Sequence, residues 1–184
     1  LRFGGLDFRS WDIHDYLLDW YNELARHGHK AFREPFSNYT PPYLYLLYVM
    51  TKTAGFIPRI AAIKLPAIGF DFLNAFLVYR ILKIRHPQGV TALIGASSFL
   101  LLPTIWMNSA YWGQSDAIFT CFLLGCIFFL MQEQPLIAMI FWGISFSFKA
   151  QAAFLSPLIL LLIIRKKIPW YYAGIVPVIY GLLI

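Results

Sequence analysis

The sequence contains few charged residues, and acidic residues are the scarcest of them. Asp and Glu total 9 against 15 Lys and Arg, and charged residues make up only 13% of the 184 positions. Soluble globular domains carry about 25% charged residues. Because 59% of the positions are hydrophobic, the composition excludes an ordinary soluble domain and predicts an integral membrane protein.

Cysteine is also scarce, and this excludes a disulfide-rich scaffold. Cys121 and Cys126 lie inside one apolar segment without the spacing of a metal knuckle, so we interpret both as packing residues. The net charge of +6 would suggest nucleic acid in a soluble protein. Here the basic residues gather beside apolar segments, so we interpret them as topology signals and expect no nucleic-acid partner.

Most of the scarce acidic residues gather in the polar opening segment. Six of the nine precede position 40, and four of these, Asp12, Asp15, Asp19 and Glu23, fit one helix that starts at Ser10 and ends near Arg26, before Gly28. At 100° per residue the four acids fall within roughly 80° of one another. This pattern is typical of the solvated face of an amphipathic helix at a membrane surface.

Asp12 is the exception that we separate from this stripe. It lies in the first helical turn, where the positive end of the helix dipole favours an ionised carboxylate. A general base must be ionised before it accepts a proton. Asp12 is therefore the candidate catalytic residue.

Several apolar segments follow the opening segment. Residues 43–56 are too short to cross a membrane and are predicted to lie in the interface or to dip in and return. Pro41 and Pro42 are predicted to start that helix. The next predicted spans cover residues 60–82, with Lys64 and Asp71 inside, then 90–105 and 117–131. Residues 106–116 form a polar and aromatic junction between spans, and 135–164 are predicted to form two short helices that meet near Lys149.

These segments predict the fold class, an all-α polytopic integral membrane bundle with an amphipathic extramembrane first loop. Residues 1–42 form the loop, and residues 43–184 form the transmembrane region. The chain opens in a polar stretch and stops within an apolar run, so we expect a piece of a longer polypeptide, truncated at both ends.

The basic clusters at 80–86 and 165–167 predict the orientation of the bundle. The positive-inside rule assigns them to the cytoplasm, which sends Gln114, Asp116 and Lys149 to the outer face. The opening segment joins them there if 43–56 does not cross, and lies on the opposite side if it does. A carboxylate and a cation at one face suit a reaction between an anionic lipid-linked donor and a hydroxyl acceptor, with Lys149 neutralising a phosphate.

Two alternatives stay open at this point. Lys149 can instead snorkel, or form an ion pair with Asp116 or Asp71. The chain can also be a non-catalytic membrane subunit or a transporter, in which the same polar residues form a structural network or an ion path.

An ordered series of short motifs resembles a known enzyme family. The motifs are Asp12, Tyr16 and Trp20 on one helix, Gly28, Asn-Tyr-Thr-Pro-Pro-Tyr-Leu-Tyr at 38–45, Lys64-Leu-Pro with Asp71, Tyr-Trp-Gly-Gln-Ser-Asp at 111–116, and Phe-Lys-Ala-Gln at 148–151. Together they resemble the N-terminal part of the GT-C superfamily, which are multi-pass glycosyltransferases that use polyprenyl-phosphate sugars. The sequence is most similar to bacterial mannosyltransferase-like members.

The resemblance implies roles for individual residues. Asp12 would be the catalytic first-loop carboxylate, and the substrate-binding residues would be Tyr39, Gln114, Asp116, Lys149 and Gln151. The partners implied are a polyprenyl-phosphate-linked sugar such as mannose, a hydroxyl acceptor (glycan, lipid or protein) and the lipid bilayer of a bacterial plasma membrane. The next acid after Asp12 is Asp15, so the Asp-x-Asp pair of some members is absent. No metal ligand is assigned, although the resemblance leaves a divalent cation open as a cofactor.

Overall fold

The computed structural model describes residues 2–184, and every regular element in that range is helical. The predicted all-α class is confirmed. The α-helices are α1 (Leu18–His27), α2 (Pro41–Thr51), α3 (Arg59–Arg85), α4 (Thr91–Leu101), α5 (Pro103–Trp106), α6 (Asp116–Met131), α7 (Pro135–Phe148), α8 (Ser156–Ile164) and α9 (Ile175–Leu183). The 3-10 helices are Arg2–Gly5, Gly28–Arg33, Ala150–Leu155 and Trp170–Gly174, and π-helical turns cover Ile13–Leu17 and Met107–Trp112.

The predicted opening helix is confirmed, with a π-helical turn inside it. Helical structure runs over residues 11–27, and the Ser10 hydroxyl accepts a bond of 3.3 Å from the backbone N–H of Ile13, as expected of an N-cap. The helix ends at Gly28, whose φ of 59° suits glycine. The π-helical turn at Ile13–Leu17 leads directly into α1.

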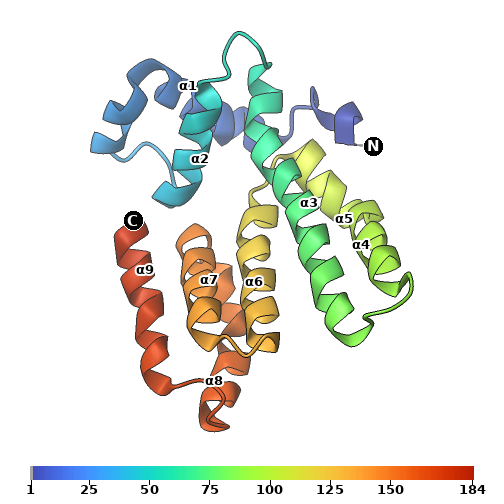
Figure 1. Cartoon of the computed structure of the whole chain (residues 1–184). Helices are drawn as coiled ribbons and strands as arrows, with labels where there is room; N and C mark the ends of the chain where they lie inside the picture. Colours follow the sequence, from blue (N-terminus) through green and yellow to red (C-terminus); the bar gives the residue numbers. More distant parts are fainter. Residues whose placement is uncertain (1) are drawn as a thin grey trace.

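The two prolines start α2, as predicted. Thr40 is extended, and Pro41 and Pro42 occupy the first turn, where a missing N–H costs nothing. The 11 residues of α2 span about 16 Å, which is too short to cross a bilayer. α2 lies beside α1 (Figure 1), and the two helices share a core that includes Tyr21, Leu24 and Leu47.

Among residues 2–184, α3 is the one unbroken helix that is long and apolar enough to cross a membrane. The second predicted span, residues 90–105, is not continuous, which corrects the prediction. α4 ends at Leu101, and the helical segment Pro103–Trp112 departs from it by 51°. Pro103 is the cause, because proline disfavours helical backbone at Leu102 and lacks the N–H that would continue the α4 ladder. Residues 107–112 of the predicted interface junction are π-helical.

The C-terminal half packs as shorter apolar helices. α7 and the helical segment Ala150–Ile164 meet at Lys149, whose backbone is extended, as predicted. Buried residues of this half, including Cys126, Met139 and Ile159, form a second core. Both cysteines are buried and free.

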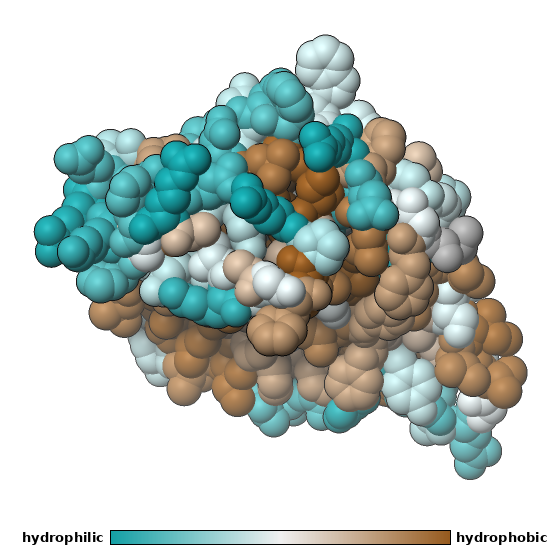
Figure 2. Space-filling view, turned by 90° about the horizontal axis from the view of Figure 1, so that it is seen from above, coloured by the Kyte–Doolittle hydropathy of each residue, from teal (hydrophilic) through white to brown (hydrophobic). Residues whose placement is uncertain are grey.

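The helices run between two chemically different ends. Figure 1 shows the connections at 86–90, 132–134 and 165–169 at the end remote from α1 and α2. The opposite end carries the polar opening segment, the start of α6 and the end of α7. Seen from above, one side of that end is mostly hydrophilic, and hydrophobic residues are exposed on the other side and between the hydrophilic ones (Figure 2). The fold therefore brings Asp12, Asp116 and Lys149 to the same end.

Candidate functional site

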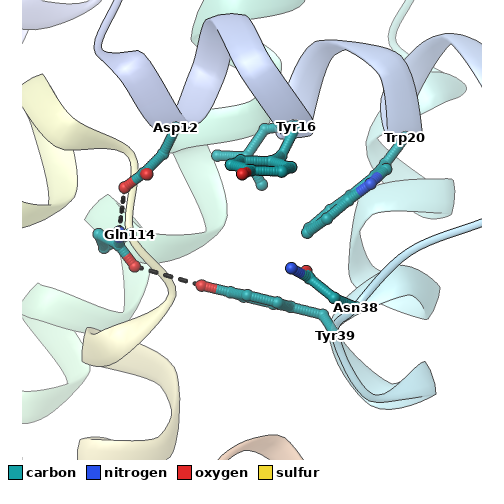
Figure 3. Close-up of a pocket in the computed structure, with 7 residues that line it drawn as sticks. Asp12, Tyr16, Trp20, Asn38, Tyr39 and Gln114 are labelled. Carbon is teal, nitrogen blue, oxygen red and sulfur yellow. Dashed lines mark hydrogen bonds between the residues drawn. The ribbon is translucent and has the colours of Figure 1, made fainter.

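The centre of the candidate site is a hydrogen-bonded chain from Asp12 through Gln114 to Tyr39 (Figure 3). The side-chain amide of Gln114 donates from Nε2 to Asp12 Oδ2. Tyr39 donates its hydroxyl to Gln114 Oε1 at 3.2 Å. Three residues that the sequence predicted for the site are thus in contact, although they lie far apart along the chain.

This chain borders a cavity of about 130 Å³. Its lining consists of Asp12, Tyr16, Leu17, Trp20, Asn38, Tyr39 and Gln114, and we call it the first cavity. Aromatic rings form much of its wall, since the Trp20 and Tyr39 ring centroids lie 5.1 Å apart and Tyr16 lies 6.1 Å from Trp20. One side of the cavity is therefore a carboxylate with an amide, and the other is aromatic.

Local backbone features bring Gln114 to Asp12. Ser10, which caps the opening helix, also donates its hydroxyl to the backbone oxygen of Trp112 at 2.6 Å. Gly113 then turns the chain with a φ of 80°, a conformation that glycine adopts without strain. A Cβ added there would lie 3.0 Å from Ile13 Cδ1. Glycine is required at this position because the loop approaches the opening helix closely.

Lys149 and Asp116 form an ion pair next to the first cavity. Lys149 Nζ donates to Asp116 Oδ1 at 2.5 Å, and the Lys149 side chain is only 14% exposed. The same ammonium lies 5.4 Å from the centre of the Tyr39 ring, within cation–π range. Of the alternatives left open by the sequence, the pair with Asp116 is the one formed. Lys149 therefore contacts Tyr39, which is one of the residues that line the first cavity.

The remaining acidic residues of the opening helix lie on its surface. Asp15 pairs with His14 at 2.7 Å, and Glu23 pairs with His27 at 2.6 Å. Asp19 is exposed. Only Asp12 of the predicted stripe lines the first cavity, which agrees with its separation from the other three.

Gln151, the last predicted substrate-binding residue, does not join this group. It is exposed in the 3-10 helix Ala150–Leu155 and is not among the residues that line the first cavity. The break after Lys149 changes the direction of the chain, so a spacing of two residues does not keep the two side chains together. A role for Gln151 stays a prediction.

The described residues do not form a site with three protein ligands for a metal ion. Within residues 2–184 there is no group of three or more His, Cys, Asp or Glu side chains that could hold one. Asp12 is bonded to an amide, and Asp116 is bonded to an ammonium. We therefore derive no step through a divalent cation.

Two further features border the site. Burial raises the pKa of the Tyr43 hydroxyl above its ordinary value, and the neighbouring Tyr39 adds to the rise, so Tyr43 stays protonated. An apolar groove of about 370 Å³ is lined at one place by Pro42 and by Phe148, the residue before Lys149. Its lining is Pro42, Tyr45, Leu46, Phe122, Ile144, Phe148, Ile179, Leu182 and Leu183, and we call it the apolar groove.

Tyr16, Trp20 and Asn38 line the cavity but were not assigned to the site from the sequence. A signal was present, because Asp12, Tyr16 and Trp20 recur every four residues and therefore share one helical face. Asn38 offers no such signal, since only the fold brings the segment before α2 against the opening helix. Comparison of the chain with protein-family models, curated proteins and solved structures found no match.

Proposed function

We propose that this chain is the N-terminal part of a polytopic membrane glycosyltransferase, which transfers a sugar from a polyprenyl phosphate to a hydroxyl acceptor. One observation carries the proposal: Asp12 and Lys149, a carboxylate and a largely buried cation, are joined through Gln114 and Tyr39 at one end of a helical bundle. A base and a phosphate-binding cation are the two groups that this reaction requires.

The first cavity suits part of a sugar ring. A cavity of about 150 Å³ holds one benzene molecule, and the first cavity is slightly smaller at about 130 Å³, whereas a hexose has twice as many non-hydrogen atoms as benzene. Trp20 and Tyr39 offer apolar faces for the C–H face of a ring, whereas Asp12 and Gln114 offer bonds to hydroxyl groups. Mannose is the sugar that the sequence resemblance favours.

The phosphate and the lipid chain have separate surroundings next to this cavity. Lys149 is a compact cation with three donors, of which Asp116 takes one, so a phosphate oxygen can share it. The apolar groove is lined in part by Phe148, the residue before Lys149. A polyprenyl phosphate with its phosphate at Lys149 would therefore have its chain in the apolar groove and its sugar in the first cavity.

The reaction then proceeds by proton transfer and displacement. Asp12 accepts the proton of the acceptor hydroxyl, and the hydroxyl oxygen forms a bond to the anomeric carbon of the sugar. The bond from that carbon to the phosphate oxygen breaks, and the polyprenyl phosphate leaves with its additional negative charge beside Lys149. Inversion at the anomeric carbon follows from the sequence resemblance and from a single displacement.

The membrane arrangement rests on composition and charge. α3 meets the length and hydropathy of a span, and the bent pair α4 and Pro103–Trp112 meets them jointly. The end remote from the site carries Arg80, Lys83, Arg85, Arg165, Lys166 and Lys167 against Glu133 alone. The span α3 and the bent pair favour a multi-pass protein, and the positive-inside rule favours an orientation with the site at the outer face of a bacterial plasma membrane.

Binding of a polyprenyl phosphate tests the proposal. The intact protein in nanodiscs is titrated with a radiolabelled polyprenyl phosphate, and Lys149→Met is compared with Lys30→Met, a change at an exposed lysine. Loss of a hydrogen bond to a charged group costs about 1.5–3 kcal/mol, so Lys149→Met should weaken binding by about 10- to 100-fold. Equal affinities for the two folded variants would remove Lys149 from the site, and absence of binding to the unsubstituted protein would overturn the proposed function.

A further inference from the structure

A second cavity lies on the other side of the loop that carries Gln114. Its volume is about 110 Å³, and it lies between α3, the Pro103–Trp112 segment and α6. It is lined by Asp71, Asn74, Phe99, Thr104, Ile105, Asn108, Ser109, Asp116, Ala117 and Thr120. Most of these side chains are polar, although the surrounding helices are apolar.

Asn74 is the residue that points to a ligand in the second cavity. It is only 1% exposed, and its Nδ2 donates to the backbone oxygen of Ala117 at 2.9 Å. Within residues 2–184, no group donates to Asn74 Oδ1. A buried acceptor without a partner is unfavourable and rare in folded proteins. The second cavity is therefore suited to a molecule that donates a hydrogen bond to Asn74 Oδ1.

The charges around the second cavity exclude a charged ligand. Asp71 accepts bonds from Arg2 at 3.1 Å and from Ser109 at 2.5 Å. Asp116 accepts from Lys149 at 2.5 Å and from Asn108 at 2.9 Å. Each carboxylate is thus compensated by one cation and one neutral donor. A further buried cation or anion would be uncompensated, so the ligand is neutral.

The second cavity also has an opening and further hydrogen-bonding groups. Thr104 lines it and is exposed, and it follows the bend of 51° between α4 and Pro103–Trp112. Thr120 lines the cavity from α6. Each threonine hydroxyl can donate one hydrogen bond and accept others. Two hydroxyls and one amide acceptor match a ligand that carries several hydroxyl groups.

We propose that the second cavity binds hydroxyl groups of a neutral polyol, such as the sugar of a glycolipid that enters at the α4–α5 bend. Asp12 lines the first cavity and not the second, so as an acceptor subsite the second cavity would hold hydroxyl groups of the acceptor other than the one that reacts. That role rests on the proposed transferase function, whereas the binding itself does not. Asp116 borders this cavity and also holds Lys149, so the polyol and the donor phosphate would lie on either side of one carboxylate.

Three probes with the same eight-carbon tail test the ligand class. Octyl glucoside, octyltrimethylammonium and octanoate carry neutral, cationic and anionic headgroups, and each is titrated below its micellar concentration against the intact protein in nanodiscs. We expect saturable binding of the glucoside at least 10-fold tighter than binding of either charged probe. A preference for the cationic or anionic probe overturns the neutral ligand, and absence of saturable binding for all three leaves the second cavity to water and overturns the site.

Two variants locate the bound glucoside. Asn74→Leu keeps the approximate side-chain volume but removes the unpaired acceptor, and Thr104→Val removes a hydroxyl at the opening. Each should weaken glucoside binding by at least 5-fold, whereas Asn22→Leu, which changes an asparagine bonded to Arg59, should not. Unchanged affinity in a folded Asn74→Leu or Thr104→Val protein overturns the assignment.

A comparison with the donor separates this proposal from the proposed function. We expect Lys149→Met to bind the glucoside at least as tightly as the unsubstituted protein, because Asp116 without its cation favours a hydroxyl group in the second cavity. The same variant should lose polyprenyl phosphate, whereas Asn74→Leu should lose the glucoside and keep polyprenyl phosphate. Glucoside binding in a protein that binds no polyprenyl phosphate would support the second cavity and refute the transferase. Binding of polyprenyl phosphate without binding of the glucoside would support the transferase and refute the second cavity as a polyol site.

Discussion

Replacement of Asp12 by asparagine separates the charge of this side chain from its shape. Asp12 accepts a hydrogen bond from the Gln114 amide and lines the first cavity. An asparagine amide oxygen can accept the same bond, so the chain from residue 12 through Gln114 to Tyr39 is expected to persist. An amide cannot take the proton from the hydroxyl group of the sugar acceptor, so general-base catalysis is lost.

The expected magnitudes differ between activity and stability. Loss of a general base lowers the rate by about 10²–10⁴-fold. The hydrogen bond from Gln114 changes from a charged acceptor to a neutral one, which costs on the order of 1 kcal/mol. The Asp12→Asn protein should therefore fold normally and bind the donor while its turnover falls by at least 100-fold.

The matched control is Asp15→Asn. Asp15 is exposed and paired with His14 on the surface, and an exposed pair contributes about 1 kcal/mol or less. Transfer of the sugar from a mannosyl polyprenyl phosphate is measured for both variants at equal folded amounts. Equal small losses would refute the role of Asp12, and a larger loss in Asp15→Asn would assign the base to the next turn.

Two other changes probe the framework around the site. Asp71→Ala leaves the Arg2 guanidinium without its buried partner and should destabilise the protein by about 3–5 kcal/mol in thermal unfolding; a change below about 1 kcal/mol would contradict this. Gly113→Ala forces a side chain into a φ of 80° and against Ile13, at a cost of about 1–2 kcal/mol. Gly113→Ala should also slow sugar transfer, because it moves Gln114. A Gly113→Ala protein with an unchanged transfer rate and an unchanged unfolding temperature would contradict this prediction.

The helices were predictable wherever a local signal controls them. Ser10 and Gly28 bound the opening helix, and Pro41 and Pro42 start α2. Such signals act within one or two turns of chain. The bend before Pro103 has a sequence signal of the same kind, because a proline interrupts residues 90–105, although the hydropathy of these residues by itself predicts one continuous span. The π-helical turn at Ile13–Leu17 has no comparable sequence signal.

The candidate site was predictable only in part, because its contacts join distant segments. Asp12, Gln114 and Tyr39 were each singled out, yet no spacing rule indicates that an amide bridges the other two. Asn74 lies among apolar residues of α3, and a polar side chain inside a membrane helix is itself a signal of a buried function. Its unpaired oxygen becomes evident only when the neighbours of α3 are known.

The segment from Gly113 to Asp116 couples the two cavities. Gln114 faces the first cavity, Asp116 faces the second, and Gly113 is held against Ile13 of the opening helix. A ligand that shifts Asp116 also shifts Lys149, which lies over the Tyr39 ring. Binding in one cavity should therefore change affinity in the other, and thermodynamic linkage requires the change to be equal in both directions. A sugar donor whose phosphate draws Lys149 away from Asp116 would leave that carboxylate uncompensated. Asp116 would then favour a hydroxyl group that donates a hydrogen bond to it from the second cavity.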